Sequence, residues 1–199
     1  MRLIEVINLT KYFGEETVLK NFSMTLEEGE IVAVMGSSGR GKSTLLNILG
    51  GLDKEYSGTV QYAPEVFRET EIPFPYVFQE SHSLLPWKSV EENVRIAGKR
   101  LTQARIEEAL TSVGLFEHRK KKPGELSGGM KQRVSLARAL VCNARVMLLD
   151  EPFASLDEEM RRKLQELIRD LSRSKNIAMV LVTHERSEAD TLADRIIFL

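Results

Sequence analysis

The chain has 199 residues, of which 42% are hydrophobic, so it can bury one good core but not two large independent domains. Its 28 basic and 29 acidic residues nearly balance, which excludes a global field that would by itself recruit nucleic acid or an anionic membrane. The only cysteine, Cys142, excludes an internal disulfide, and the early charges at the N-terminus are unlike a signal peptide. Both observations favour a reducing, cytoplasmic setting.

The chain opens with a pattern typical of short antiparallel strands. Apolar and polar residues alternate over 3–9, a turn containing Gly14 follows, and a second run covers 18–26. Three later segments are apolar throughout: 31–35, 146–149 and 177–182. Strands without polar alternation are covered on both faces, which predicts a parallel α/β core. All three are far shorter than the roughly 20 residues that a bilayer-spanning helix needs.

Helical periodicity separates these strands. Helices are predicted over 42–49, 128–141 and 157–172, the last with Asp157 as its N-cap and two glutamates in its first turn. Between about 80 and 133 the pattern is charged and helical, with helices expected over 90–100 and 102–113. We therefore expect a helical insertion in the α/β core.

A phosphate-binding loop follows the first apolar strand. Residues 36–43 match the spacing G-x-x-x-x-G-K-[ST] and precede a predicted helix. Glycines let consecutive N–H groups face phosphate oxygens, Lys42 supplies charge at the outer phosphates, and the Ser43 hydroxyl is suited to a magnesium ion. A glycine-rich turn that precedes a helix by coincidence is the alternative, and the strand and helix context disfavours it. The predicted nucleotide ligands here are Gly36, Ser37, Ser38, Gly39, Arg40, Gly41, Lys42, Ser43 and Thr44.

Two acids end the second apolar strand. Ligands of open α/β sheets gather beyond the carboxyl ends of strands, so Asp150 and Glu151 should emerge beside the phosphate loop. Asp150 is suited to hold magnesium through water, while Glu151 could polarise the water that attacks the outer phosphorus. On their own the two acids would be ordinary solvated loop residues.

Residues 126–133 read Leu-Ser-Gly-Gly-Met-Lys-Gln-Arg and resemble the signature of ABC ATPases. In that family the signature of one subunit completes the ATP site of a second, antiparallel subunit. A capped helix start explains Ser127 but not two successive glycines, which destabilise a helix by about 1 kcal/mol each relative to alanine. The resemblance adds Ser127, Gly128, Gly129 and Met130 as nucleotide contacts, although Met130 replaces the family's usual glutamine, and Arg40 is larger than is common in the phosphate loop.

The resemblance extends over nearly the whole chain. It implies that Tyr12 stacks on adenine beside Val18, that Gln79 senses magnesium and joins the site to the helical insertion, that Asp157 lies in a loop crossing the dimer, and that His184 contacts the outer phosphate. Without the resemblance, Tyr12 would be an edge-strand tyrosine, Gln79 a solvated turn residue and His184 structural.

The fold that the resemblance implies is a P-loop NTPase of RecA-like α/β type. The core is expected at 1–79 and 134–199, with a mainly parallel sheet and an N-terminal antiparallel β subdomain, and the helical subdomain at about 80–133. The implied activity is hydrolysis of ATP to ADP and phosphate, with ATP and Mg²⁺ bound. The catalytic groups would be Glu151, His184, Lys42 and Gln79, and the metal ligands Ser43, Gln79 and Asp150.

The segment 84–94 looks most like importers of the nitrate, sulfonate, taurine and thiamine-precursor group. Leu84, Leu85 and Trp87 are expected to receive a membrane permease, because aromatic residues concentrate at interface cores. Alternatively, Trp87 anchors the subdomain's own small core. We further expect a second copy of the chain as partner, a solute-binding protein in the complex, no nucleic acid, and a peripheral position on the inner face of the cell membrane.

Other readings remain open at this point. A soluble ABC ATPase of DNA repair, chromosome maintenance or translation would share every nucleotide motif. A P-loop kinase is disfavoured by the signature and by Glu151 after Asp150. The basic run at 118–122 is interpreted as a solvated loop. Cargo, transport direction, and a homodimer as opposed to a paralogous pair cannot be read from these residues.

Overall fold

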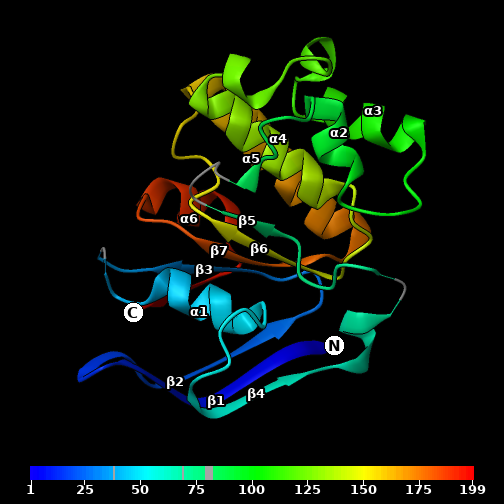
Figure 1. Cartoon of the computed structure of the whole chain (residues 1–199). Coiled ribbons are helices and arrows are strands. Elements are labelled where there is room, and N and C mark those ends of the chain that lie inside the picture. Colours follow the sequence, from blue (N-terminus) through cyan, green and yellow to red (C-terminus); the bar gives the residue numbers. More distant parts are fainter. Residues whose placement is uncertain (38, 69, 79–82) are drawn as a thin grey trace.

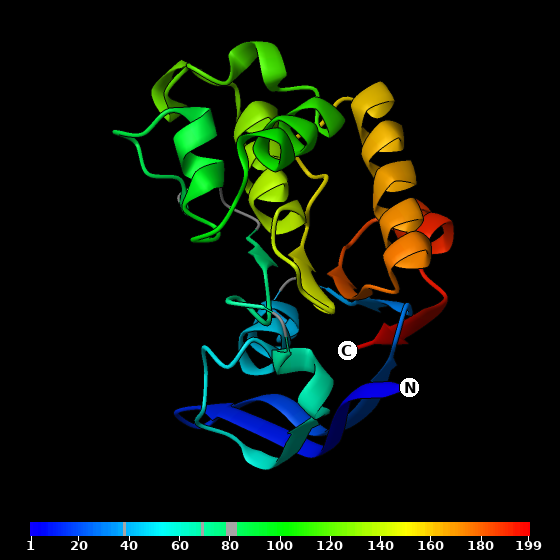
Figure 2. The ribbon, with the colours of Figure 1, turned by 90° about the vertical axis from the view of Figure 1, so that its right-hand side faces the viewer.

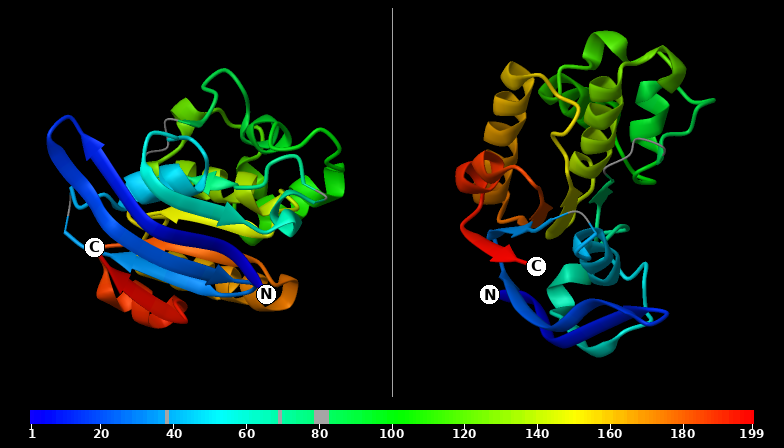
Figure 3. Two further views of the ribbon diagram at one scale, coloured as in Figure 1. Left: turned by 90° about the horizontal axis from the view of Figure 1, so that it is seen from below. Right: turned by 90° about the vertical axis from the view of Figure 1, so that its left-hand side faces the viewer.

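The computed structural model describes residues 1–37, 39–68, 70–78 and 83–199, which form two sheets and several helices. The first sheet is antiparallel and has the strand order β2-β1-β4. Its strands are β1 (Arg2–Phe13), β2 (Glu16–Glu27) and β4 (Ser57–Tyr62). Figure 3 shows β1 and β2 running side by side to a hairpin at the edge of the molecule. The predicted antiparallel opening of the fold is confirmed.

The second sheet is parallel, with the order β5-β6-β7-β3-β8. Its strands are β3 (Ile31–Met35), β5 (Tyr76–Val77), β6 (Val146–Asp150), β7 (Ala178–Val182) and β8 (Arg195–Phe198). Every residue of β3, β6 and β7 is buried, as the three apolar runs predict. The edge strands β5 and β8 are additions that the pattern of apolar runs did not predict.

Helices cover both faces of the parallel sheet (Figure 1). Helix α1 (Lys42–Leu49) lies between the two sheets, where its leucines join a core formed with β1, β2 and one face of β3, β6 and β7. The other face is covered by α4 (Gly128–Leu140), α5 (Glu158–Lys175) and α6 (Arg186–Leu192). The layering therefore matches the predicted P-loop NTPase fold.

The helical lobe contains α2 (Val90–Arg95) and α3 (Gln103–Ser112), which pack against α4 (Figure 2). Short 3-10 turns lie at η1 (Pro64–Phe67), η3 (Phe116–His118) and η4 (Pro123–Glu125). The helix expected over 90–100 begins where predicted, but its predicted end is wrong, because α2 ends at Arg95. Ile96 is its C-cap, and Gly98 disfavours another turn. Helix α3 agrees with the expected 102–113 to within one residue at each end, because Thr102 is its N-cap and Val113 its C-cap.

The division of the chain into core and helical subdomain stays a prediction. Helix α4 runs without a break across position 133, where the boundary between the two was expected, so one helix belongs to both regions. Among the described residues, no helix is both long enough and apolar enough to cross a bilayer.

Leu84 and Trp87, two of the three residues expected to receive a permease, have different environments. Leu84 is only 5% exposed and belongs to the core shared by the helical lobe and the sheet, so its predicted place on the partner surface is wrong. Trp87 is 67% exposed, which contradicts the alternative that it anchors the lobe's own core. Leu85 is half-buried between them.

Candidate active site

The phosphate loop joins the end of β3 to the start of α1. The Lys42 ammonium is held close to this loop, since it donates hydrogen bonds of 2.9 Å to the carbonyls of Gly36 and Ser37. Gly41 has a φ of 83°, and a Cβ there would lie 2.7 Å from Cγ1 of Val18. Glycine is thus required both by the backbone conformation and by close contact with Val18. Val18 therefore lies against the phosphate loop.

Asp150 lies at the end of β6, two strands from the phosphate loop, and is 5% exposed. Its Oδ2 accepts a 3.3 Å hydrogen bond from the Tyr76 hydroxyl, while its Oδ1 is buried with no hydrogen-bond partner in the described part of the chain. Burial raises the pKa of Asp150, and the Ser43 and Tyr76 hydroxyls act in the opposite direction. The pKa of Tyr76 is also raised, by burial and by the adjacent carboxylate.

These features fit the expected Mg²⁺. Oδ1 of Asp150 is a buried carboxylate oxygen that accepts no hydrogen bond from the described residues, and the Ser43 hydroxyl lies beside the same carboxylate. Mg²⁺ prefers hard oxygen ligands of this kind. In the described ranges no group of three or more histidine, cysteine or acidic side chains could hold a metal alone. Magnesium in nucleotide sites usually takes its further ligands from phosphate oxygens and water.

Glu151 directly follows β6 and adopts a left-handed backbone conformation with a φ of 45°. Such a conformation costs about 1–3 kcal/mol in a residue other than glycine and is concentrated at functional sites. The Glu151 N–H donates to the carbonyl of Val182 at 2.9 Å, and its Oε1 lies 3.3 Å from Nδ1 of His184. The Glu151 carboxylate therefore lies beside the histidine that follows β7.

His184 is more than half exposed, but the residues around it are fixed. The Thr183 hydroxyl accepts a 3.0 Å hydrogen bond from the Glu185 N–H and donates one of 2.6 Å to Oε2 of Glu188. The other oxygen of Glu188 lies 3.7 Å from Nε of Arg161 in α5. This network was not predicted from the sequence, in which Glu188 belongs to a short polar segment.

The signature segment forms the start of α4 and packs against the loop at 155–157 of the same chain. Ser127 is the N-cap, and its Oγ accepts a 3.2 Å hydrogen bond from the Met130 N–H. A Cβ on Gly129 would lie 2.6 Å from the carbonyl oxygen of Ser155, whereas one on Gly128 would find its nearest atom at 3.9 Å. Packing within the chain thus accounts for Gly129 and leaves Gly128 unexplained.

The remaining predicted residues are distributed over the molecule. Tyr12 is 54% exposed on β1, near the hairpin, and Arg40 is exposed in the phosphate loop. Met130 is half-buried and packs against the core of the helical lobe. Asp157 is confirmed as the N-cap of α5, since its Oδ1 accepts a 2.9 Å hydrogen bond from the Met160 N–H. Gln79 and Ser38 lie outside the described residues.

The fold and this set of residues define the class of protein, a P-loop ATPase with the signature of an ABC cassette. A family model described as "ABC transporter" matches residues 19–154. The arginine transport ATP-binding protein ArtM of Bacillus subtilis (strain 168) is 42% identical over 216 residues, covering 99% of this chain and 87% of that protein.

Further relatives point the same way. The aliphatic sulfonates import ATP-binding protein SsuB of Zymomonas mobilis subsp. mobilis is 42% identical over 196 residues, covering 98% of this chain and 81% of that protein. A dimeric post-hydrolysis structure of the ATP-binding cassette MJ0796, bound to ADP and Pi, has a TM-score of 0.86 and 33% identity, with 99% and 94% of the two chains covered.

The chain belongs to the ABC transporter family. It is an ATP-binding subunit that hydrolyses ATP, and this hydrolysis is coupled to transport. These relatives do not favour the alternative that the chain is a soluble ABC ATPase of DNA repair, chromosome maintenance or translation.

Proposed function

We propose that the residues around the ends of β3, β6 and β7 hold ATP and Mg²⁺ and hydrolyse the outer phosphate. The observation that carries this proposal is the geometry of Glu151, which has a left-handed backbone conformation and whose Oε1 lies 3.3 Å from Nδ1 of His184. Lys42 would neutralise the outer phosphates, and Tyr12, Val18 and the loop 36–44 would bind the rest of the nucleotide. In this scheme positioning and charge stabilisation supply most of the catalysis.

Two side chains would act at the reacting centre, one on the attacking water and one on the outer phosphate. Glu151 would accept a hydrogen bond from that water and orient it toward the outer phosphorus. His184, held beside Glu151, would donate to an outer phosphate oxygen. Bound Mg²⁺ would neutralise charge on the phosphates; Ser43 and Asp150 would hold it, and we propose Gln79 as a further ligand.

We propose that a second copy of the chain completes each site. The start of α4 offers the N–H groups of its first turn and the Ser127 hydroxyl, which suit a phosphate. Gly128 supports this role, because no packing contact in its own chain requires a glycine there. Asp157 and its loop lie against the same helix start and would meet the partner across the dimer.

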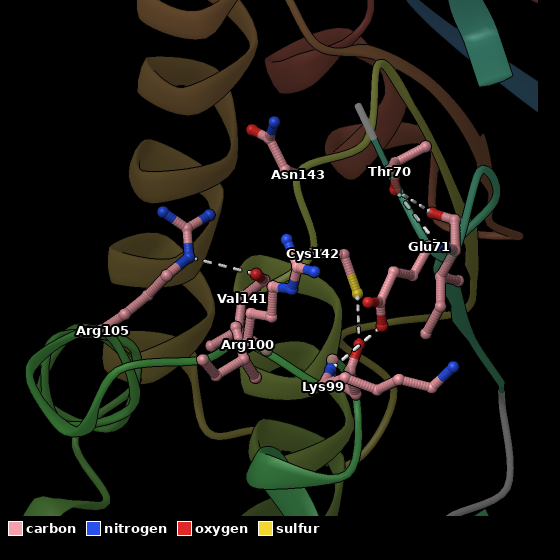
Figure 4. A pocket seen from close by; sticks show the side chains of 12 residues that line it. Thr70, Glu71, Lys99, Arg100, Arg105, Val141, Cys142 and Asn143 are labelled. Carbon is pink, nitrogen blue, oxygen red and sulfur yellow. Dashed lines mark hydrogen bonds between the residues drawn. The ribbon is translucent and has the colours of Figure 1, made fainter. Parts of the chain in front are cut away.

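We propose that a membrane permease docks in a groove between the helical lobe and the sheet. A hollow of about 240 Å³ is lined by aromatic and aliphatic side chains that include Phe78 and Ile96, which are 37% and 44% exposed. It shares Ile72, Ala97 and Cys142 with a larger hollow of about 530 Å³ (Figure 4). Trp87 and Leu85 belong to the same lobe and would also contact the permease.

The rim of the larger hollow suggests the chemistry of the docking segment. Lys99, Arg100 and Arg105 line it together with one acid, Glu71, whose Oε2 accepts a hydrogen bond from the Lys99 N–H. The Nε of Arg105 donates to the carbonyl of Val141, which anchors this side chain at the wall. A permease segment with one apolar side and an acidic end would match this lining.

The cargo is proposed from the relatives. Several of them are named for aliphatic sulfonate import, which agrees with the resemblance of the segment 84–94, and we propose a small organic anion of that group, delivered by a solute-binding protein. The chain would then lie peripherally on the inner face of the cell membrane.

Dimerisation of a hydrolysis-deficient variant tests the composite site. Glu151→Gln with ATP and magnesium should form a dimer in light scattering. Ser127→Arg in the same background should abolish the dimer, because the larger, cationic arginine side chain blocks the phosphate position. If both proteins remain monomeric while they bind ATP, the shared site is wrong. ATP binding itself is measured separately with a fluorescent nucleotide.

A further inference from the structure

A buried carboxylate holds the segment that carries His184. Glu188 belongs to α6 and is only 3% exposed, and its Oε2 accepts the hydroxyl proton of Thr183 at 2.6 Å. Thr183 is itself 1% exposed. Because a hydroxyl has one proton, its donation to Glu188 leaves the lone pairs of Thr183 to accept the Glu185 N–H, at 3.0 Å.

The backbone is therefore anchored on both sides of His184. On one side, the Thr183 N–H donates to the carbonyl of Val34 at 3.3 Å, which ties it to the strand before the phosphate loop. On the other side, the Glu185 N–H is held by the Thr183 hydroxyl. Between these two anchored residues lies His184, whose Nδ1 is 3.3 Å from Oε1 of Glu151.

The same carboxylate reaches the helix that follows the dimer-facing loop. Oε1 of Glu188 lies 3.7 Å from Nε of Arg161, which is itself buried and has no hydrogen-bond partner in the described part of the chain. Arg161 lies in the first turn of α5, where its N–H donates to the carbonyl of Asp157 at 2.9 Å. Glu188 thus contacts both the histidine segment and the beginning of α5.

The burial of this acid has a cost that stability alone does not justify. An isolated buried carboxylate is strongly unfavourable, and even a paired one is often no better than an apolar side chain of the same size. Burial also raises the pKa of Glu188, with the Thr183 hydroxyl and Arg161 acting in the opposite direction. Of the two groups that offset this cost, the Thr183 hydroxyl belongs to the segment that carries His184.

We propose that Glu188 is a positioning residue for His184, acting through the Thr183 hydroxyl. Its carboxylate sets the orientation of that hydroxyl, the hydroxyl sets the turn at 183–185, and the turn keeps the imidazole beside Glu151. The catalytic consequence rests on the role proposed above for His184, whereas the structural consequence does not.

Conservative variants of Thr183 and Glu188 test the inference in the full chain. Thr183→Val keeps the shape but removes the hydroxyl and should lower kcat at least tenfold, with the affinity for a fluorescent ATP analogue changed less than twofold. Thr183→Ser restores the hydroxyl and should stay within threefold of the unaltered protein. Glu188→Gln should fall between them, because its amide oxygen still accepts the Thr183 proton. Asp190→Asn, the same type of change at an exposed site of α6, is the matched control and should leave kcat unchanged.

The imidazole signals in proton NMR provide a readout independent of hydrolysis. Thr183→Val and Glu188→Gln should shift or broaden the ring resonances of His184, assigned with His184→Ala, and leave those of His118 unchanged. Unchanged His184 signals in both variants would overturn the inference, as would equal losses of kcat in Thr183→Val and Thr183→Ser. If His184→Ala hydrolyses ATP at the unaltered rate, the role proposed for His184 fails, while the NMR result still decides whether Glu188 positions the ring.

Discussion

The Tyr76 hydroxyl donates a hydrogen bond of 3.3 Å to Oδ2 of Asp150, although the two residues lie 74 positions apart in the chain. The contact exists because the two-residue strand β5 pairs with β6, with Tyr76 opposite Leu148. A short edge strand thus holds one oxygen of the magnesium-binding candidate and leaves the other oxygen, Oδ1, without a partner among the described residues.

Removal of this hydroxyl should shift the pH dependence of ATP hydrolysis. The hydrogen bond from Tyr76 favours the charged form of Asp150, so Tyr76→Phe raises the pKa of that carboxyl beyond its already raised value. Since the proposed magnesium ligand must be ionised, the acid limb of kcat/KM against pH should move to higher pH. Tyr62→Phe removes a hydroxyl bonded to the carbonyl of Leu49 and should leave the limb in place. A limb that moves equally in both variants would contradict the assignment.

Replacement of Asp150 should stabilise the protein in the absence of nucleotide and magnesium. The raised pKa means that Asp150 makes its full contribution to stability only below its ordinary value of 3.8, and that this contribution is lost as pH rises through the raised folded value. At pH 8 the folded protein carries a desolvated carboxylate that Asp150→Asn removes. Thermal unfolding should therefore show a higher Tm for the variant at pH 8, and the difference should shrink as the pH is lowered. The sign of the Tm difference at pH 8 decides the matter.

The two signature glycines should respond to alanine in opposite directions. Gly129→Ala places a Cβ 2.6 Å from the Ser155 carbonyl oxygen, and such overpacking costs about 1–3 kcal/mol. Gly128→Ala meets nothing closer than 3.9 Å in its own chain and should stabilise the start of α4 by up to about 1 kcal/mol. Urea denaturation of the nucleotide-free protein measures both changes. A loss of stability in Gly128→Ala would show that its glycine has a structural reason after all.

Truncation of Leu84 should lower the free energy of unfolding far more than truncation of Trp87. Leu84→Ala removes a side chain that is 5% exposed, and a buried leucine truncated in this way costs about 2–5 kcal/mol. Trp87 is 67% exposed, so Trp87→Ala should change the free energy of unfolding by well under 1 kcal/mol. Equal losses in urea denaturation would mean that Trp87 is buried in solution. Basal ATP hydrolysis by Trp87→Ala checks that its nucleotide site is intact.

The sequence predicted the elements that have strong local signals. Three apolar runs became the central strands because their burial on both faces removes polar alternation, and the phosphate loop and Asp157 were found because their spacing and capping chemistry are local. Tyr76 was missed because a two-residue strand has no periodicity to detect.

Other features depended on tertiary packing. Which side chain of the segment 84–87 faces solvent is decided by the position of α4 and the sheet, so the leucine and the tryptophan could not be assigned separately. Gly129 received a purely functional explanation because its contact with Ser155 joins two segments that are distant in the chain. The hydrogen bond between Glu188 and Thr183 depends on how the chain turns between β7 and α6, which no spacing encodes.

The register of the parallel sheet has a mechanical consequence. Val182, the last residue of β7, pairs with Val34 of β3 on one side and with Asp150 of β6 on the other. The phosphate loop, the two acids and the histidine segment therefore extend from three strands that are locked edge to edge and cannot slide independently. In the proposed ATP cycle, movement would then come from the parts attached to these three strands. The spacing within one proposed half-site would stay constant, while the approach of a second copy of the chain would turn hydrolysis on and off.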